Sequence, residues 1–282
     1  MLEMNEPMHF FDSHCHFDFV EFNADRAALW QDCNRRGITR LLIPGVTPEQ
    51  WQRAAQLCTQ YSGLFYSAGI HPHWIERQQW FQKNPEGLLT EQTQEKIIAL
   101  ISTEILQSTG VDNLLCVAVG ECGLDKMIAT PLEVQQQLLN THIHVANQLH
   151  KPLIVHCVRA HNELIALLKK HSVKHGGVIH AFTGSYETAR QYVELGFYLG
   201  VGGAITYERA QKTRTALSKI PLDYLVLETD APDMPLQGKQ GQRNTPATIP
   251  EVAQVLAELR GVSSDEIAAA TWKNTLTLFH CR

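Results

Sequence analysis

Short apolar segments alternate with longer amphipathic segments along most of the chain. Continuous apolar runs of a few residues are typical of strands buried on both faces, whereas apolar residues spaced three and four apart indicate helices. We expect strands at residues 9–12, 38–43, 64–69, 114–120, 152–155, 177–179, 197–202 and 224–229. We expect helices at residues 25–36, 48–61, 91–107, 132–149, 162–170, 187–195, 209–219, 249–259 and 264–279.

This alternation predicts the fold class. Short buried strands, each followed by a helix, favour an α/β protein whose parallel sheet closes into a (β/α)8 TIM barrel rather than an open doubly wound sheet. The chain has 282 residues and 44% hydrophobic composition, which is enough for the core of one such barrel. We therefore expect a single domain over residues 1–282, with residues 1–7 as a flexible N-terminal tail.

Composition excludes several classes of protein. The seven cysteines are an odd number without a Cys-x-x-Cys pair, which is typical of neither a disulfide framework nor a zinc ribbon and predicts a reducing cytoplasm. The sequence shows neither a signal-peptide pattern nor an apolar stretch long enough to span a bilayer, so we expect no membrane association. The net charge is −5 without a Lys/Arg run, so any phosphate ligand must be held locally. We expect a monomer.

Metal-ligand residues follow five of the expected strands. His14 and His16 come directly after the first strand, and side chains two apart on a strand point the same way, so both imidazoles can reach one ion. Later apolar runs end in Glu121, His156 and His180, and the last ends in Asp230. The C-terminal ends of barrel strands meet at one end of the barrel, so we expect these residues to lie together.

The types of these ligands predict hydrolytic chemistry. Imidazole nitrogens and carboxylate oxygens without a thiolate suit Zn²⁺, Mn²⁺, Co²⁺ or Mg²⁺. Six ligands are too many for one open catalytic ion, so two ions bridged by Glu121 fit better. Two ions that share an activated water suit phosphoester hydrolysis. Asp230 is the natural general base, because it can bind one ion and still face that water.

A second His-x-His pair and two aspartates near the expected ligands are further candidates. His142 and His144 also form a His-x-His pair, but they lie within a helical pattern in which positions two apart do not face each other. We expect them to lie on a solvated helix face. Asp12 and Asp125 lie beside the expected ligands and either orient ligand histidines or cap strand ends.

Six motifs occur in order along nearly the whole chain. They are Phe-Asp-Ser-His-Cys-His at 11–16, Gly-Ile-His-Pro at 69–72, Val-Gly-Glu-Cys-Gly-Leu-Asp at 119–125, Val-His at 155–156, His-Ala-Phe-Thr-Gly at 180–184 and Leu-Glu-Thr-Asp-Ala-Pro at 227–232. Together with Arg-Asn-Thr-Pro at 243–246 and the segment 274–279, this pattern resembles the TatD family of metal-dependent deoxyribonucleases in the amidohydrolase superfamily.

The resemblance implies a barrel of the metal-dependent hydrolase type with two ions. One ion would lie among His14, His16, Glu121 and Asp230, and the other among Glu121, His156 and His180. The implied reaction is hydrolysis of DNA phosphodiesters, often from a 3′ end, with single-stranded DNA, DNA ends or a small phosphodiester as the substrate.

The resemblance implies that His71 faces the substrate phosphate. Among the cations near the expected mouth, we expect Arg159 and Arg243 to contact the substrate as well. Many relatives carry an arginine where Val158 stands, so Arg159 is one place later than that pattern.

Other functions share parts of this pattern. An amidohydrolase or a small-molecule phosphoesterase would use the same barrel and the same His-x-His pair. Many two-metal amidohydrolases bridge their ions with a carbamylated lysine on the fourth strand, and Glu121 in that place disfavours the first alternative. A metal-binding scaffold without turnover is disfavoured because the ligand set includes a candidate base, Asp230.

Overall fold

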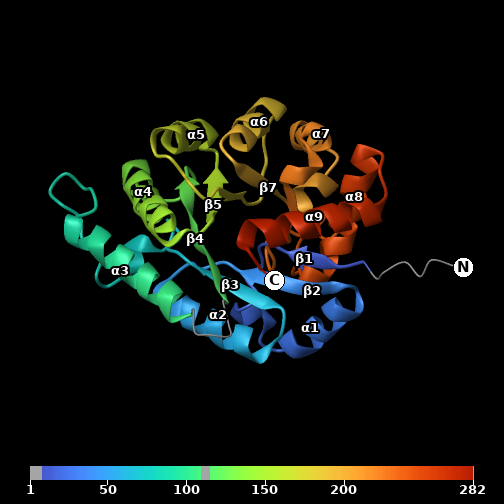
Figure 1. Ribbon diagram of the computed structural model, residues 1–282, viewed down its shortest axis with the longest axis horizontal. Helices are drawn as coiled ribbons and strands as arrows, with labels where there is room; N and C mark the ends of the chain where they lie inside the picture. Colours follow the sequence, from blue (N-terminus) through green and yellow to red (C-terminus); the bar gives the residue numbers. More distant parts are fainter. Residues whose placement is uncertain (1–7, 109–114, 282) are drawn as a thin grey trace, which may run out of the picture.

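Eight parallel strands form the centre of the molecule (Figure 1). The computed structural model describes residues 8–108 and 115–281. Each strand pairs in parallel with the next in sequence order, which confirms the expected barrel. The strands are β1 (Phe10–Asp12), β2 (Ile38–Ile43), β3 (Leu64–Ala68), β4 (Cys116–Asp125), β5 (Leu153–Val158), β6 (Gly177–Ile179), β7 (Phe197–Val201) and β8 (Leu225–Leu227).

The α-helices form a ring around these strands (Figure 1). They are α1 (Arg26–Arg35), α2 (Pro48–Gln60), α3 (Glu91–Gln107), α4 (Leu132–Leu149), α5 (His161–Lys170), α6 (Tyr186–Glu194), α7 (Gln211–Lys219), α8 (Ile249–Arg260) and α9 (Ser264–Phe279). Short 3-10 helices interrupt the loops: η1 (Val20–Phe22), η2 (Ile75–Arg77), η3 (Gly203–Thr206), η4 (Leu222–Tyr224) and η5 (Pro246–Thr248). Capping residues mark the start of several helices. In α2, for example, the side chain of the N-cap residue Thr47 accepts a hydrogen bond from the amide of Gln50, and Pro48 lies in the first turn.

The barrel closes where β1 meets β8. The amide of Ser13 donates a hydrogen bond of 2.9 Å to the carbonyl of Leu227. The buried carboxylate of Asp12 accepts hydrogen bonds from the amide and the hydroxyl of Thr229, at 3.0 and 2.6 Å. These contacts join the first and last strands at the end of the barrel that carries the expected ligands.

The last residues of helix α9 cover the opposite end of the barrel. Side chains alternate along the strands, so Leu42 faces a different side from its neighbours Leu41 and Ile43. Leu42 belongs to a buried cluster with Ile154 of β5, and Leu278 near the end of α9 packs in the same cluster. The N-terminal end of the barrel is therefore filled by apolar side chains, whereas the expected ligand residues lie at the C-terminal end.

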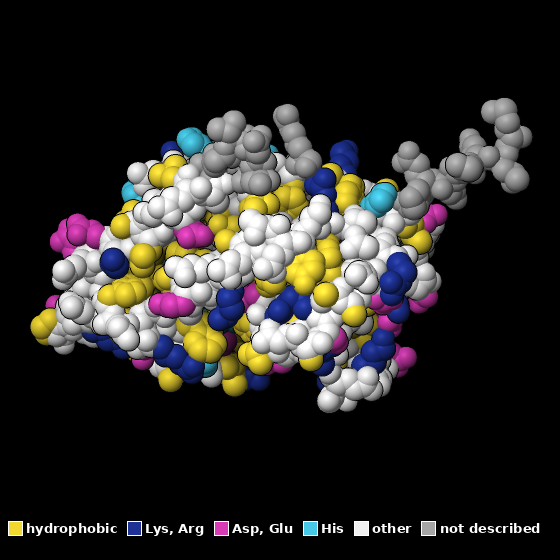
Figure 2. All heavy atoms as spheres, turned by 90° about the horizontal axis from the view of Figure 1, so that it is seen from below, with side chains coloured by type: hydrophobic (Ala, Val, Ile, Leu, Met, Phe, Trp, Pro, Cys, Tyr) yellow, Lys and Arg dark blue, Asp and Glu magenta, His cyan; other side chains and the backbone are white. Residues whose placement is uncertain are grey.

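The outer surface carries charges of both signs. On the described part of the face in Figure 2, Lys and Arg side chains are interspersed with Asp and Glu side chains, so no continuous basic stripe crosses this face. Within the described residues, no helix is both long and apolar enough to cross a membrane. The tail expected at 1–7 and the fourth-strand start expected at 114 lie outside the described residues.

Candidate metal centre

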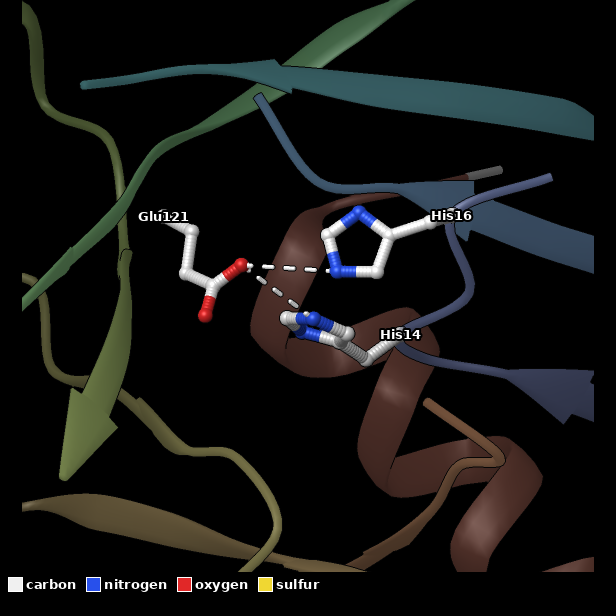
Figure 3. A group of neighbouring side chains, drawn as sticks. All are labelled: His14, His16 and Glu121. Atoms are coloured by element: carbon white, nitrogen blue, oxygen red, sulfur yellow. Dashed lines mark ion pairs between the residues drawn. The ribbon is translucent and has the colours of Figure 1, made fainter. Parts of the chain in front are cut away.

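The first ligand group lies at the C-terminal end of the barrel (Figure 3). The Nε2 atoms of His14 and His16 lie 3.4 and 3.8 Å from Glu121 Oε2. The same two nitrogens lie 3.5 and 3.6 Å from Asp230 Oδ1. Tetrahedral ligands with zinc bonds of about 2.0–2.2 Å are separated by roughly 3.3–3.6 Å, so these four separations are close to what one ion requires. Asp230 also groups with His14 and His180, whose ligand atoms lie within 4.8 Å of one another and of Asp230.

A second group surrounds the other oxygen of Glu121. Glu121 Oε1 lies 2.9 Å from His180 Nε2, 3.1 Å from His156 Nδ1 and 3.5 Å from His71 Nε2. The structure therefore brings all six expected ligands together. It also places His71, expected only at the substrate, among atoms that could hold a metal. Each oxygen of Glu121 therefore faces its own set of imidazoles.

A bulge in β4 directs Glu121 toward this position. Val119 pairs with Leu153, but Cys122 pairs with Val155, so two residues, Gly120 and Glu121, stand opposite one residue of β5. Gly120 has φ 129°, and a Cβ there would lie 2.4 Å from the carbonyl oxygen of Ile154, so only glycine fits. The Glu121 amide donates to the carbonyl of Gly45 at 2.7 Å.

The expectation that Glu121 and His156 follow the ends of their strands was wrong. Strand β4 continues past Glu121 to Asp125, and β5 continues past His156 to Val158. The apolar run ends at these residues because they carry polar side chains. The backbone ladder continues because its hydrogen bonds do not depend on the polarity of the side chains.

Asp125 and Asp12 support the centre in different ways. Asp125 Oδ2 lies 3.1 Å from His156 Nε2, so the ring donates its Nε2–H to this carboxylate and turns the lone pair of Nδ1 toward Glu121. Asp125 thus orients a ligand candidate. Asp12 accepts from the backbone amides of His14 and Thr229 instead, and so connects the loops that carry the candidates after β1 and β8.

Glu228 lies behind His180, and the sequence did not predict that it supports this ligand candidate. Its Oε1 accepts a hydrogen bond from the amide of Ala181 and lies 4.0 Å from His180 Nδ1. Burial raises the pKa of Glu228 to about 8. A Cβ at Gly200 would lie 2.1 Å from Glu228 Oε2, so glycine at this position makes space for the carboxylate. The available signal was the position of Glu228 directly after the apolar run of β8.

The electrostatics of the cluster favour a cation. Burial raises the pKa of Glu121, but the surrounding imidazoles, His180 first, more than offset this and hold it well below its usual value. Burial lowers the pKa of His14 to about 3, so this ring is neutral. Burial also opposes a charge on His180, yet the Glu121 carboxylate raises the pKa of that ring to about 10. The buried negative charge thus draws positive charge to this place.

Unpartnered atoms show that the residues fit a metal. His14 Nε2 and Glu121 Oε2 are buried and have no hydrogen-bond partner within residues 8–108 and 115–281. Leaving such atoms unsatisfied is costly, and a divalent cation between them would satisfy both. The donor set of imidazole and carboxylate, together with its spacing, therefore supports binding of divalent metal.

The two arginines expected at the substrate have different surroundings. Arg159 is exposed directly after β5, with φ 54°. Arg243 forms a bidentate ion pair with Asp25, in which Nη1 lies 2.9 Å from Oδ1 and Nη2 lies 2.5 Å from Oδ2. Its guanidinium lies 4.9 Å from the centre of the Phe22 ring. Arg243 is thus tied to the segment before α1, whereas the side chain of Arg159 is accessible at the end of the barrel where the ligands lie.

His142 corrects one expectation. His144 is exposed, as expected, but His142 is fully buried. Its Nδ1–H donates to the carbonyl of Leu138 at 2.7 Å, and its Nε2 accepts from the amide of Ile70 at 2.9 Å. Burial lowers the pKa of His142 to about 4, which keeps the ring neutral as this arrangement requires. His142 therefore holds the loop that carries His71.

We expect the substitution His142→Ala to destabilise the fold by about 1–3 kcal/mol, because it leaves the buried amide of Ile70 without an acceptor. Denaturant unfolding measures this change. His144→Ala, on the exposed face of the same helix, is the matched control and should stay within about 0.5 kcal/mol of wild type. Equal stability of the two variants would contradict the positioning role of His142.

The chain is similar to known metal-dependent hydrolases. The family model described as "TatD related DNase" matches residues 11–280. The chain is 39% identical over 272 residues to the Escherichia coli K12 protein described as "Uncharacterized metal-dependent hydrolase YjjV", covering 96% of this chain and 98% of that protein. The crystal structure of YjjV, a TatD homologue, has a TM-score of 0.83 and 38% identity and covers 98% of this chain and 100% of its own.

A relative with a more specific name is the "3'-5' ssDNA/RNA exonuclease TatD" of Shigella flexneri. It is 32% identical over 277 residues, which cover 95% of this chain and 98% of that protein.

Proposed function

The chain belongs to the TatD family of metal-dependent hydrolases, and from this premise we propose that it is a deoxyribonuclease that uses two divalent ions to cleave DNA phosphodiester bonds. The observation that carries the proposal is the position of Glu121, whose two carboxylate oxygens face two different sets of imidazoles. A bridged pair of ions suits the displacement of an oxygen at phosphorus. The name of the Shigella flexneri relative, a 3'-5' ssDNA/RNA exonuclease, supports a nucleic-acid phosphodiester as the substrate.

We assign the ligands to two sites by which oxygen of Glu121 they face. His14, His16, Glu121 and Asp230 hold one ion, and Glu121, His156 and His180 hold the other. Bound Zn²⁺, Mn²⁺, Mg²⁺ or Co²⁺ would supply the positive charge that acidifies water and offsets charge on the phosphate oxygens.

Asp230 is the proposed general base. Its Oδ1 points toward His14 and His16, which leaves Oδ2 to take a proton from the attacking water. The side chain of Asp230 is 16% exposed, against 3% for Glu121, so of the two carboxylates it is the one that solvent reaches.

His71 and Arg159 are the proposed phosphate contacts. His71 Nε2 lies 3.5 Å from Glu121 Oε1 in the second ligand group, its side chain is 13% exposed, and its ring is edge-on to His156 at 4.4 Å between centroids. Arg159 is exposed immediately after the strand that carries His156. Arg243 would have to release Asp25 before it could contact DNA, so we assign it a lesser part.

A panel of substrates tests the proposal. Protein stripped with a chelator and reconstituted with Mn²⁺, Zn²⁺, Mg²⁺ or Co²⁺ is incubated with single-stranded DNA labelled at either end, duplex DNA, RNA, bis(p-nitrophenyl) phosphate and a cyclic amide. We expect metal-dependent cleavage of single-stranded DNA that proceeds from the 3′ end.

The stripped protein is the control and should cleave nothing. Hydrolysis of the cyclic amide without cleavage of any phosphodiester would favour the amidohydrolase alternative and overturn the nuclease proposal. Cleavage of bis(p-nitrophenyl) phosphate alone would restrict the enzyme to small phosphodiesters.

A further inference from the structure

A pocket opens beside the metal centre, between the loops that follow β1, β2 and β3. Its volume is about 450 Å³, within the range of small-molecule sites. We call it the loop pocket, and we define it by six of its lining residues, Asp18, Phe19, Val20, Val46, Arg53 and Trp74. None of these residues belongs to the ligand groups described above.

The walls of the loop pocket are connected to the metal centre. The ring of Phe19 stacks on the ring of His16, with centroids 4.5 Å apart and planes 25° apart. The amide of Trp74 donates to the carbonyl of His71 at 2.9 Å, and the amide of His71 donates to the carbonyl of Val46 at 3.1 Å. A group bound in the pocket would therefore lie next to a phosphate held at the centre.

The apolar walls favour a flat ligand. His16 takes one face of the Phe19 ring, and the guanidinium of Arg77 lies 4.3 Å from the centre of the Trp74 ring. The ring of His73 also packs edge-on against Trp74, with centroids 5.1 Å apart. A ligand in the pocket would contact the parts of Phe19 and Trp74 that line it. Val20 beside them is 74% exposed, which is unusual for a large apolar side chain and extends the apolar surface. Aromatic rings of this kind stack bases without regard to sequence.

Asp18 adds a polar recognition element. Its side chain is fully buried, and Oδ2 lies 3.3 Å from Arg53 Nη2. Its Oδ1 meets hydrogen-bond geometry with no residue that the structure describes, although the Gln50 side chain, which also lines the pocket, is close enough to oppose the rise that burial causes in the pKa of Asp18. A buried carboxylate oxygen without a donor is costly, so a ligand that brings an N–H group to Asp18 would be favoured. The exocyclic amino groups of cytosine, adenine and guanine are such donors, whereas thymine offers a carbonyl oxygen and a methyl group.

We propose that the loop pocket binds the nucleobase of the nucleotide next to the scissile phosphodiester. The base lies between Phe19 and Trp74, and its amino group donates to Asp18. The proposal rests on the proposed nuclease function and deepens it, because it gives a reason for base-dependent cleavage by a centre whose metal ligands contact only phosphate and water.

The test compares single-stranded oligonucleotides that differ only in the 3′-terminal nucleotide, which is dC, dT or abasic. We expect reconstituted wild-type protein to cleave the dC end with a kcat/KM about tenfold above the abasic end, the scale of one stacked base. We also expect the dC end to be cleaved faster than the dT end. Both quantities are ratios within one protein sample, so differences in folding or metal loading between samples cancel.

Variants separate the two parts of the pocket. Trp74→Ala should bring the ratio of dC to abasic close to one. Asp18→Asn should keep that ratio but lose the preference for dC over dT, because an amide can donate to thymine as well as accept from cytosine. His144→Ala, on the exposed face of α4, should keep both ratios.

Two outcomes would overturn the proposal in different ways. Equal cleavage of dC and abasic ends by an active wild-type enzyme, or unchanged ratios in both pocket variants, would exclude base binding in the loop pocket and leave the nuclease function intact. Failure of the wild-type protein to cleave any of the oligonucleotides would overturn the nuclease function, and the base pocket with it.

Discussion

Replacing Glu121 with glutamine is expected to reduce the bound divalent ions from about two per chain to one or none and to lower the rate of phosphodiester cleavage by more than about 100-fold. Residues that only support a metal ligand cost 10–100-fold when they are removed, and Glu121 contacts both ligand groups itself. The amide nitrogen of glutamine cannot ligate a cation, and the substitution removes the negative charge shared by five imidazoles. Elemental analysis after equilibration with Mn²⁺ or Zn²⁺ measures the ions, and oligonucleotide cleavage measures the rate.

The control for this prediction is Glu133→Gln, which makes the same change on an exposed residue in the first turn of α4. It should bind as many ions as wild type. Two tightly bound ions in Glu121→Gln would contradict the bridging role, and one ion in wild-type protein after saturation would contradict the two-ion proposal itself. Circular dichroism would show that the barrel of Glu121→Gln remains folded.

The barrel and the meeting of the six ligands could be predicted because both follow from a repeated local pattern. Each strand is a short apolar run, and His14, His180 and Asp230 follow such runs closely enough that parallel strands bring them to one end. The single-domain organisation, the monomeric state and the cytoplasmic location stay predictions.

The details that sequence reasoning missed depend on partners far away in the chain. The burial of His142 is stabilised by a hydrogen bond from Ile70, which lies 72 positions earlier. The bulge at Gly120 depends on the carbonyl of Ile154 in the neighbouring strand. A helical or strand pattern shows which residues share a face, but it does not show which polar group on another element will satisfy a buried side chain.

Asp230→Asn is expected to keep the barrel folded and to retain the ion at the second group, while kcat for DNA cleavage falls by about 10²–10⁴-fold, the range for a lost general base. Asp230 Oδ1 lies 3.5 Å from His14 and 3.6 Å from His16, and a ligand atom of Asp230 also lies within 4.8 Å of His180. His156 and His180 nevertheless keep Glu121 Oε1 at 3.1 and 2.9 Å, so we expect the second group to retain its carboxylate without Asp230. Asparagine keeps the shape of the side chain but cannot accept the proton of water. The defect should therefore lie in kcat more than in KM, as steady-state kinetics on single-stranded DNA would measure.

The matched control is Asp265→Asn on the exposed first turn of α9, which should keep the wild-type kcat. A kcat close to wild type in Asp230→Asn would exclude Asp230 as the base. Glu228 could not easily replace it, because its side chain is fully buried behind His180 and its Oε1 already accepts the amide of Ala181. If Asp230→Asn instead lost both ions and its fold, the first ligand group would be needed for the structure of the barrel mouth. The assignment of Asp230 as the general base would then have to be withdrawn.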